Sequence, residues 1–359
     1  MAHTHPSSTS HLTAIDQVEQ TLRVFFDQHT DAAQHISPHY GALWGHMRRL
    51  VLSGGKRLRP KMALVAYEAF GGKNIEAMVP VAASLELLHA SLLMHDDIID
   101  RDYTRYGVLN VAGGYREEYA DLVADPDERT HYANSAALLG GDLLLSGAYQ
   151  LISQSTFAYI DRALAHQQLS EAMFHVAGGE LLDTESAFRS LGDVPSELVA
   201  VHKTASYTFI TPLLIGASLA DIAPEQKVLL RIFAETLGVA FQLQDDLLGV
   251  FGDSQTTGKT TLGDLREGKR TYMVEQFFAL ADSEQKAAFM DGFGKESLTQ
   301  TQADQLRSLL AISGAKHATE VSIAQYENRA RRALNELAIS EQFRAQFVEL
   351  IDKAVRRLK

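Results

Sequence analysis

The amino-acid sequence predicts an all-α protein. Long apolar runs recur with helical spacing, and no segment alternates apolar and polar residues as a half-buried strand would. At 359 residues, with 46% hydrophobic content, the chain is long enough to bury a large core. Helix follows helix to the C-terminus, so residues 13–359 are predicted to form a single all-α domain after a disordered polar tail at residues 1–12.

Composition limits the possible functions. The formal net charge of −12 argues against a general nucleic-acid binder, so an anionic ligand must be bound by a local basic patch or a metal. The absence of cysteine excludes disulfides, thiolate metal sites and a cysteine nucleophile. The first twelve residues are polar without the apolar centre of a secretory signal, so we expect a cytoplasmic protein. Residues 143–160 are uncharged but contain serine and glutamine, which favours a core helix, and no transmembrane segment is expected.

The helical segments follow from apolar patterning and from the residues that interrupt it. Gly71 and Gly72 break the pattern, and Pro212 predicts a kink. The polar, acidic stretch 103–132 is predicted to be a long loop or lid with a short helix. Helices are predicted over Thr13–Leu52, Lys61–Phe70, Ile75–Asp102, within Ala133–Phe174, over Ala200–Leu219, and from Ala234 to Asp246.

The helix predicted to end at Asp102 carries a group of carboxylates after an apolar run. Asp96 and Asp100 are four residues apart, so they share one helix face, with Asp97 about a quarter-turn away. Like charges repel there unless a cation lies between them, and Mg²⁺ prefers carboxylate and phosphate oxygens. An acidic helix end that faces solvent is the alternative, although acids there oppose the helix dipole.

A basic, glycine-containing stretch precedes this helix. Ser53–Lys61, read as SGGKRLRPK, places Lys56, Arg57, Arg59 and Lys61 within six residues. Glycine allows close approach of the backbone, while lysine and arginine supply a point charge and a bidentate fork for phosphate. The alternative is a solvated surface loop.

A second helix also ends in paired aspartates. It carries Gln242, Asp245 and Asp246, and a polar loop with Lys259, Asp264, Lys269 and Arg270 follows. Two such helices are predicted to face each other across a cavity with metals between them, where the nearby lysines meet the same anion.

Taken together, these motifs resemble the trans-isoprenyl diphosphate synthases, or polyprenyl synthetases, and most of all a bacterial geranylgeranyl diphosphate synthase. The resemblance runs from about Gly54 to the C-terminus. It implies an isoprenoid-synthase-type helical bundle around a deep central cavity, a homodimer, and head-to-tail condensation of an allylic diphosphate (dimethylallyl, geranyl or farnesyl) with isopentenyl diphosphate. The matching motifs are GGKRLRP (54–60), HDDIID with Arg105 and Gly107 (95–107), GGD (140–142), GGELLD (178–183), HKTA (202–205), and FQLQDDLLG through GKTTLGD and GKRT (241–271).

The resemblance also assigns roles to particular residues. Ionisation of an allylic diphosphate places negative charge on the leaving group, which metal ions and cations stabilise most in the transition state. About three Mg²⁺ ions per active site are expected. Metal binding is assigned to Asp96, Asp97, Asp100, Asp245 and Asp246; allylic diphosphate binding to Arg105, Lys203 and Lys259; isopentenyl diphosphate binding to Gly55, Lys56, Arg59 and His89; and dipoles beside the cationic carbon to Thr204 and Gln242. Lys269 is assigned to substrate binding without a choice between the two diphosphates.

Two positions depart from the family pattern. Tyr106 stands where most members have a second arginine, which implies a weaker or rearranged isopentenyl diphosphate site. The basic C-terminus, Arg356–Lys359, is a candidate to compensate for it. Gly249 replaces the third aspartate of the second motif, leaving DDLLG, and we expect metal binding to survive because the first aspartate matters most.

The resemblance implies that product length depends on the side chains one and two turns before the first aspartate. Leu88, Ser91 and Leu92 stand there, and none is aromatic. Ser91 lies about 7.5 Å and Leu88 about 12 Å below Asp96 along a helix that rises ~1.5 Å per residue. A C20 product, geranylgeranyl diphosphate, is therefore predicted, with longer polyprenyl chains as the alternative. The same motifs allow two less favoured functions: a class I terpene cyclase, and a non-catalytic subunit of a heteromeric synthase.

Overall fold

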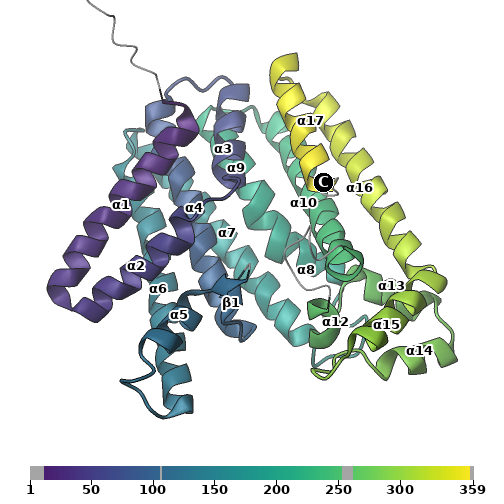
Figure 1. The fold of residues 1–359 in the computed structure, drawn as a ribbon. Helices are drawn as coiled ribbons and strands as arrows, with labels where there is room; N and C mark the ends of the chain where they lie inside the picture. The colour runs from purple at the N-terminus through teal and green to yellow at the C-terminus, as the bar shows by residue number, and fades with distance from the viewer. Residues whose placement is uncertain (1–11, 106, 253–261, 356–359) are drawn as a thin grey trace, which may run out of the picture. The chain divides into compact units, whose positions relative to one another are not determined.

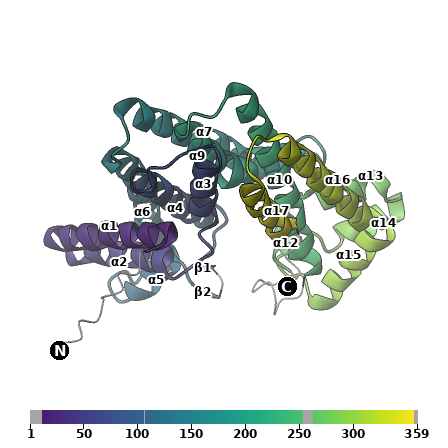
Figure 2. The same ribbon diagram turned by 90° about the horizontal axis from the view of Figure 1, so that it is seen from above.

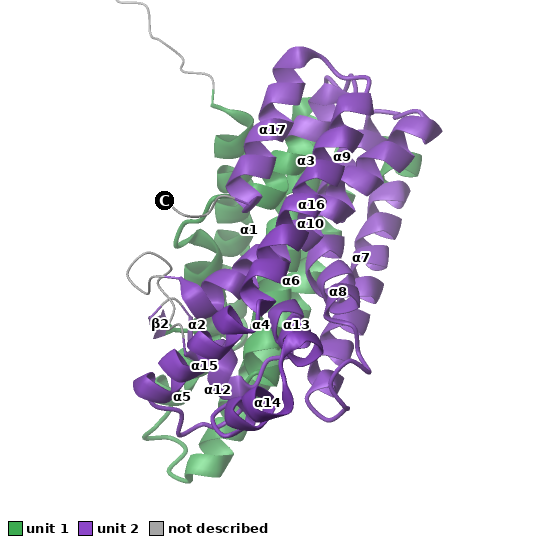
Figure 3. Ribbon diagram, turned by 90° about the vertical axis from the view of Figure 1, so that its right-hand side faces the viewer, with its two compact units in different colours: residues 1–64, 74–103, 109–162 green, residues 65–73, 104–108, 163–359 purple. Residues whose placement is uncertain are grey.

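The structure is a computed structural model that describes residues 12–105, 107–252 and 262–355. In this part of the chain the regular elements are helical, apart from two strands of two residues each (Figure 1). The predicted all-α class is therefore confirmed. The chain divides into two compact units, coloured separately in Figure 3. Unit 1 comprises residues 1–64, 74–103 and 109–162, and unit 2 comprises residues 65–73, 104–108 and 163–359. That residues 13–359 form one domain stays a prediction, and the predicted tail lies outside the described residues except for Leu12.

Unit 1 is built around α4, an apolar helix that packs against α1, α2, α5 and α6. The antiparallel helices α1 and α2 lie side by side (Figures 1 and 2), and Phe26 and Trp44 meet edge to face between them. The elements of unit 1 are α1 (Ala14–Ile36), α2 (Pro38–Leu52), the first half of α3 (Leu58–Ala69), α4 (Ile75–Ile99), α5 (Val111–Glu118) and α6 (Pro126–Gln154).

Unit 2 is organised around α10, which packs against η1, α9, α12, α13, α16 and α17. Near the C-terminus, α16 and α17 lie side by side (Figure 1). Its elements are the second half of α3, β1 (Thr104–Arg105), the first residue of β2 (Val108–Leu109), most of α7 (Tyr159–Ser186), α8 (Ser196–Val199), η1 (Ala200–Ile210), α9 (Thr211–Leu219), α10 (Pro224–Phe251), α12 (Gly263–Glu267), α13 (Tyr272–Leu280), α14 (Ser283–Met290), α15 (Gln300–Ile312), α16 (Ala315–Glu336) and α17 (Glu341–Val355).

Small residues allow close helix packing inside each unit. A Cβ atom at Gly141 of α6 would lie 2.2 Å from the His95 ring of α4. In unit 2, a Cβ atom at Gly179 of α7 would lie 2.2 Å from the backbone nitrogen of Lys203 in η1. Since real Cβ atoms do not approach this closely, the backbone of η1 leaves no space for a side chain at Gly179, and a side chain at Gly141 would displace the ring of His95. Both glycines belong to the GGD and GGELLD motifs, whose second glycines therefore have a structural role.

Two details of the sequence-based prediction were wrong. The stretch 103–132 contains the predicted short helix, α5, but it is not otherwise one long loop, because β1 and β2 form a two-stranded sheet and α6 already begins at Pro126. Residues 143–160 do not form one helix, because Ser155 adopts an extended conformation and its hydroxyl donates to the carbonyl of Ala77. A π-helix over Ala200–Ile210 ends two residues before Pro212, and the predicted kink at this proline stays a prediction. Proline has no N–H for the usual helical bond, and the wider winding accommodates its ring.

Three helical segments are long and apolar enough to cross a membrane by length and composition alone. They are Ile75–Ile99, Pro126–Gln154 and Ser196–Leu219. In the folded protein, the most apolar 18-residue stretch of each segment is 78%, 50% and 61% buried, in the same order. That the chain has no transmembrane segment stays a prediction.

Candidate active site

The first acidic motif lies at the C-terminal end of α4, in unit 1. Asp96 is partly exposed, Asp100 is exposed, and Asp97 is buried with 4% of its surface accessible. Carboxylate oxygens of Asp96 and Asp100 lie within 4.8 Å of each other. This confirms that the spacing of four residues places both side chains on one helix face.

The GGKRLRP loop enters α3 through an unusual backbone. Gly54 and Gly55 have φ angles of 114° and 142°, which favour glycine, and both are exposed. Lys56 is exposed and Arg59 is half-buried, so the loop presents cations beside accessible backbone. That arrangement suits a phosphate ligand.

Arg57 does not belong to this basic surface, which corrects its inclusion among the phosphate-binding cations of the loop. Its φ of 46° turns the side chain inward, where it is 6% exposed. The guanidinium donates to Glu19 at 2.6 Å, to Glu86 at 2.8 Å and to the carbonyl of Val51 at 2.7 Å. Arg57 therefore stabilises unit 1, because its charge is already balanced by two carboxylates.

The predicted chain-length residues follow one another along α4. Leu88 and Ser91 have no accessible surface, and Leu92 is half-buried. The buried hydroxyl of Ser91 has no hydrogen-bond partner within the described part of the chain. His89, assigned to isopentenyl diphosphate, is half-buried on the same helix.

The HKTA motif lies in η1 of unit 2. The ammonium of Lys203 contacts Glu180 at 2.9 Å and Asp183 at 2.7 Å, both on α7. These carboxylates stand three residues apart in GGELLD, so they face η1 together. The sequence showed the pair of acids but not their partner, and Lys203 is held in position by them.

Thr204, Gln242 and Asp246 form a hydrogen-bonded chain between η1 and α10. The hydroxyl of Thr204 donates to the amide oxygen of Gln242, whose nitrogen donates to Asp246 at 2.8 Å. Asp246 is 7% exposed, while Asp245 beside it is half-buried. Burial raises the pKa of Asp246 to about 7; Lys269 opposes this shift, whereas Asp264 and Asp245 reinforce it. Burial and the neighbouring carboxylates thus disfavour the ionised form of Asp246, which a bound cation would favour.

Of the remaining assigned residues, one lies near this motif, one lies on β1, and the others lie outside the described residues. Lys269 is half-buried just after α12, and its charge acts on Asp246. Arg105 lies on β1. Lys259, Tyr106 and Arg356–Lys359 lie outside the described residues. Asp264 was noted in the sequence as part of a polar loop and as the last residue of the GKTTLGD motif, and its proximity to Asp246 is a finding of the structure.

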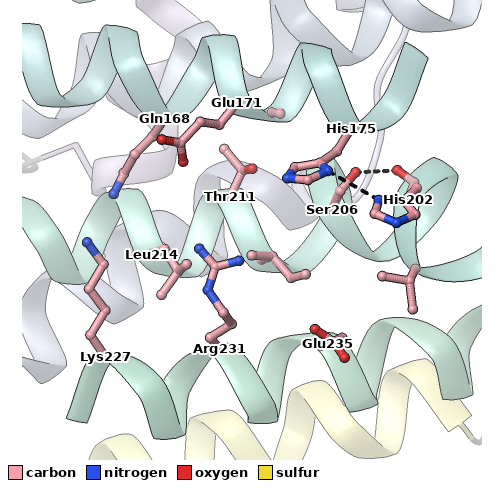
Figure 4. Close-up of a pocket in the computed structure, with 13 residues that line it drawn as sticks. Gln168, Glu171, His175, His202, Ser206, Thr211, Leu214, Lys227, Arg231 and Glu235 are labelled. Carbon is pink, nitrogen blue, oxygen red and sulfur yellow. Dashed lines mark hydrogen bonds between the residues drawn. The ribbon is translucent and has the colours of Figure 1, made fainter. Parts of the chain in front are cut away.

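A separate cavity of about 150 Å³ lies in unit 2 between α7, η1, α9 and α10 (Figure 4). His175 and His202 stack at one end, with ring centroids 5.1 Å apart and Nδ1 atoms 3.2 Å apart. Burial and the neighbouring His175 lower the pKa of His202, and Glu235 opposes the shift. The cavity contains none of the predicted site residues, although His202 directly precedes Lys203.

A family model described as polyprenyl synthetase matches residues 42–310, which contain all the motifs above. The chain belongs to the polyprenyl synthetase family. This confirms the resemblance found in the sequence, and the protein is a trans-prenyltransferase.

Individual relatives cover nearly the whole chain. A geranylfarnesyl diphosphate synthase from Aeropyrum pernix is 30% identical over 88% of this chain and 95% of its own length. A geranylgeranyl diphosphate synthase from Sulfolobus acidocaldarius is 27% identical over 90% and 94%. The crystal structure of a geranylgeranyl pyrophosphate synthase from Corynebacterium glutamicum, complexed with isoprenyl diphosphate and magnesium, matches with a TM-score of 0.86. It is 32% identical and covers 96% of this chain and 100% of that one.

Proposed function

We propose that this polyprenyl synthetase condenses an allylic diphosphate with isopentenyl diphosphate to give geranylgeranyl diphosphate. The observation that carries the proposal is the pair of acidic motifs on α4 and α10, each at the C-terminal end of an apolar helix. Both lie inside the segment that matches the family. Departure of diphosphate needs charge stabilisation rather than a nucleophilic side chain.

The residues of both motifs fit Mg²⁺. Mg²⁺ takes oxygen ligands, and the carboxylate oxygens of Asp96 and Asp100 lie within 4.8 Å of each other on one face. The raised pKa of buried Asp246, about 7, leaves its carboxyl group only partly ionised at neutral pH, so a bound cation would favour the ionised form. When bound, Mg²⁺ would neutralise charge on the departing diphosphate. We propose about three ions, held by Asp96, Asp97, Asp100, Asp245 and Asp246.

The cations of this chain would bind the two diphosphates. We assign Arg105, Lys203, Lys259 and Lys269 to the allylic substrate. Lys203 is oriented by its ion pairs with Glu180 and Asp183, so its position is fixed before substrate binds. We assign Lys56, Arg59 and His89, with the accessible backbone of Gly55, to isopentenyl diphosphate. The hydrogen bond between Thr204 and Gln242 fixes both dipoles that we assign to the cationic carbon.

The small residue at position 91 supports a product longer than C15. Ser91 and Leu88 are both buried on α4, where an aromatic ring would stop the growing chain early. The Sulfolobus acidocaldarius and Corynebacterium glutamicum proteins are named as C20 synthases, whereas the Aeropyrum pernix relative is named for the C25 product. C20 is our proposal, with a longer product as the alternative.

We propose that the enzyme is a homodimer. On α7, Phe174 and Leu181 are 78% and 68% exposed, and their spacing of seven residues places them on one face. Ala177 and Gly178 between them are also exposed. Such an apolar face is typical of a surface covered by a partner, and a second copy is the partner that a symmetric dimer provides.

The proposal is tested with purified protein, Mg²⁺, labelled isopentenyl diphosphate and each allylic diphosphate in turn. We expect labelled geranylgeranyl diphosphate as the end product. Release of diphosphate without uptake of label would instead indicate a terpene cyclase. Absence of both reactions would indicate a non-catalytic subunit, and either result would overturn the proposal.

A further inference from the structure

A groove of about 360 Å³ lies in unit 1, beside α5 and the beginning of α6. Two arginines line it, Arg116 of α5 and Arg129 of α6, together with Tyr103, Ala120 and the exposed Glu117. Neither arginine belongs to the motifs that we assign to the reaction. Two cations that line one groove of a chain with a net charge of −12 therefore need an explanation of their own.

The side chain of Arg116 is held in place without a counter-ion. Its guanidinium packs over the ring of Tyr103, with the central carbon 4.7 Å from the ring centroid. Within the described residues, this side chain makes no ion pair. A cation–π contact uses the face of the ring and none of the N–H groups, so the donors of Arg116 remain available to a ligand.

Arg129 has a buried donor that lacks an acceptor. Its Nε atom is buried and has no hydrogen-bond partner in the part of the chain that the structure describes. Its Nη1 atom donates to the carbonyl of Ala120 only at 3.5 Å. An unmet donor of a charged group is destabilising, and such a group commonly marks the place of a bound water or ion.

The neighbouring acids do not neutralise these arginines. Six carboxylates stand between Arg116 and Arg129 in the sequence, yet none forms an ion pair with either guanidinium within the described residues. Glu118 contacts His46 at 2.8 Å instead, and the side chain of Asp125 accepts backbone N–H groups at the start of α6. The charge of both arginines is therefore available to an anion in the groove.

Hydrogen bonds fix the wall that carries Tyr103. The carbonyl of Tyr103 accepts from the backbone N–H of Asn110 at 3.1 Å, and the side-chain amide of Asn110 donates to the carbonyl of Asp102 at 2.7 Å. The oxygen of the same amide accepts from the N–H of Gly113 at 2.8 Å, which caps α5. A Cβ atom at Gly113 would lie 2.0 Å from the carbonyl oxygen of Tyr103, so α5 packs directly on this wall.

We infer that the groove is a binding site for a phosphate or diphosphate group, separate from the residues that we assign to the two substrates. Arginine presents a planar fork of donors that matches phosphate oxygens, and two arginines from different helices can donate to one anion. Movement of the Arg129 guanidinium toward the anion would also give its Nε atom an acceptor. Inorganic diphosphate and the head group of a prenyl diphosphate share this chemistry.

The test is isothermal titration calorimetry of the full chain with inorganic diphosphate in the presence of EDTA, because the acidic motifs repel diphosphate without Mg²⁺. Arg116→Gln and Arg129→Gln should each raise the Kd of one site by roughly 10- to 100-fold, through loss of charge-assisted hydrogen bonds. Arg329→Gln is the matched control, because Arg329 is exposed on α16 and packs over the ring of Tyr326 at 5.3 Å.

Two further variants make the test specific to the groove. Glu117→Gln removes a carboxylate that lines it, and should lower the Kd by about 2- to 5-fold, the opposite sign to the arginine variants. The cations that we assign to the substrates also attract diphosphate, so the comparison of wild type with Arg116→Gln is repeated in Lys56→Met. The site that depends on Arg116 should persist there.

Titration with geranyl diphosphate distinguishes the two sources of the anion. If the arginines affect only inorganic diphosphate, the ligand is the free anion; if they affect only geranyl diphosphate, it is a prenyl diphosphate. Wild-type affinity for both probes in Arg116→Gln and Arg129→Gln, or an equal loss in Arg329→Gln, would overturn the inference. Circular dichroism melting identifies any variant that fails to fold. Arg116→Lys and Arg129→Lys then replace it, and should also weaken binding because lysine lacks the planar fork.

Discussion

Replacing Arg57 should destabilise the protein without acting through substrate binding. Arg57 donates four hydrogen bonds, two to Glu19, one to Glu86 and one to the carbonyl of Val51. The side chain of Glu86 is 8% exposed, so it would be left as a buried charge, whereas that of Glu19 is 28% exposed and regains water. Breaking a buried pair from one side costs about 3–5 kcal/mol, and we expect Arg57→Met to lower the free energy of unfolding by that amount.

Urea unfolding followed by circular dichroism measures this loss. Replacing both partners, as Arg57→Met with Glu86→Leu, should recover much of it, because an apolar pair of similar volume needs no solvation. Lys56→Met is the matched control on the same loop: it is exposed, so the free energy of unfolding should change by less than ~0.5 kcal/mol while the KM for isopentenyl diphosphate rises. The reasoning is refuted if Arg57→Met unfolds at the wild-type urea concentration, or raises that KM with no loss of stability.

Three further outcomes are expected. Ser91→Phe places an aromatic ring on the inner face of α4 and should shorten the product by at least one isoprene unit in chromatography; an unaltered product would show that the chain grows along another wall. Thermal stability should fall as the pH drops below 6.5, because His202 has a lowered pKa in the folded protein and the unfolded chain takes up the proton first. His202→Gln should reduce this loss, and an identical profile would assign it to other groups. Replacing Phe174 and Leu181 together by glutamate should give monomers in light scattering, whereas an unchanged dimer mass would place the interface elsewhere.

The long helices were predictable because their signals are local. The apolar run of α4 has no glycine, and its aspartates four apart needed only helical geometry to be placed on one face. The two-residue strands β1 and β2 were missed, since so short a pair has no alternating pattern to detect. The π-helix over Ala200–Ile210 was missed because π- and α-helices bury similar apolar faces, and only Pro212 marked a departure.

The site was predictable where residue type determined the role, and not where tertiary contacts did. Arg57 and Arg59 look alike in the sequence, but Glu19 and Glu86, 38 and 29 residues away, take Arg57 into the core. Gly249 was correctly recognised as a departure, yet the sequence could not show that Asp264 fills its space. This contact depends on the packing of α12 against α10, which the spacing of residues within either segment does not predict.

The central claim is that carboxylates of both acidic motifs act, through bound Mg²⁺, on the departing diphosphate. The most direct measurement is the initial rate of labelled isopentenyl diphosphate incorporation by Asp96→Ala and Asp245→Ala at saturating Mg²⁺. Asp121→Ala, an exposed aspartate of unit 1, serves as the control. We predict a loss of at least ~10²-fold in each motif variant and none in the control, because metal-held charge is the main source of catalysis. A near wild-type rate in either folded motif variant would contradict the account.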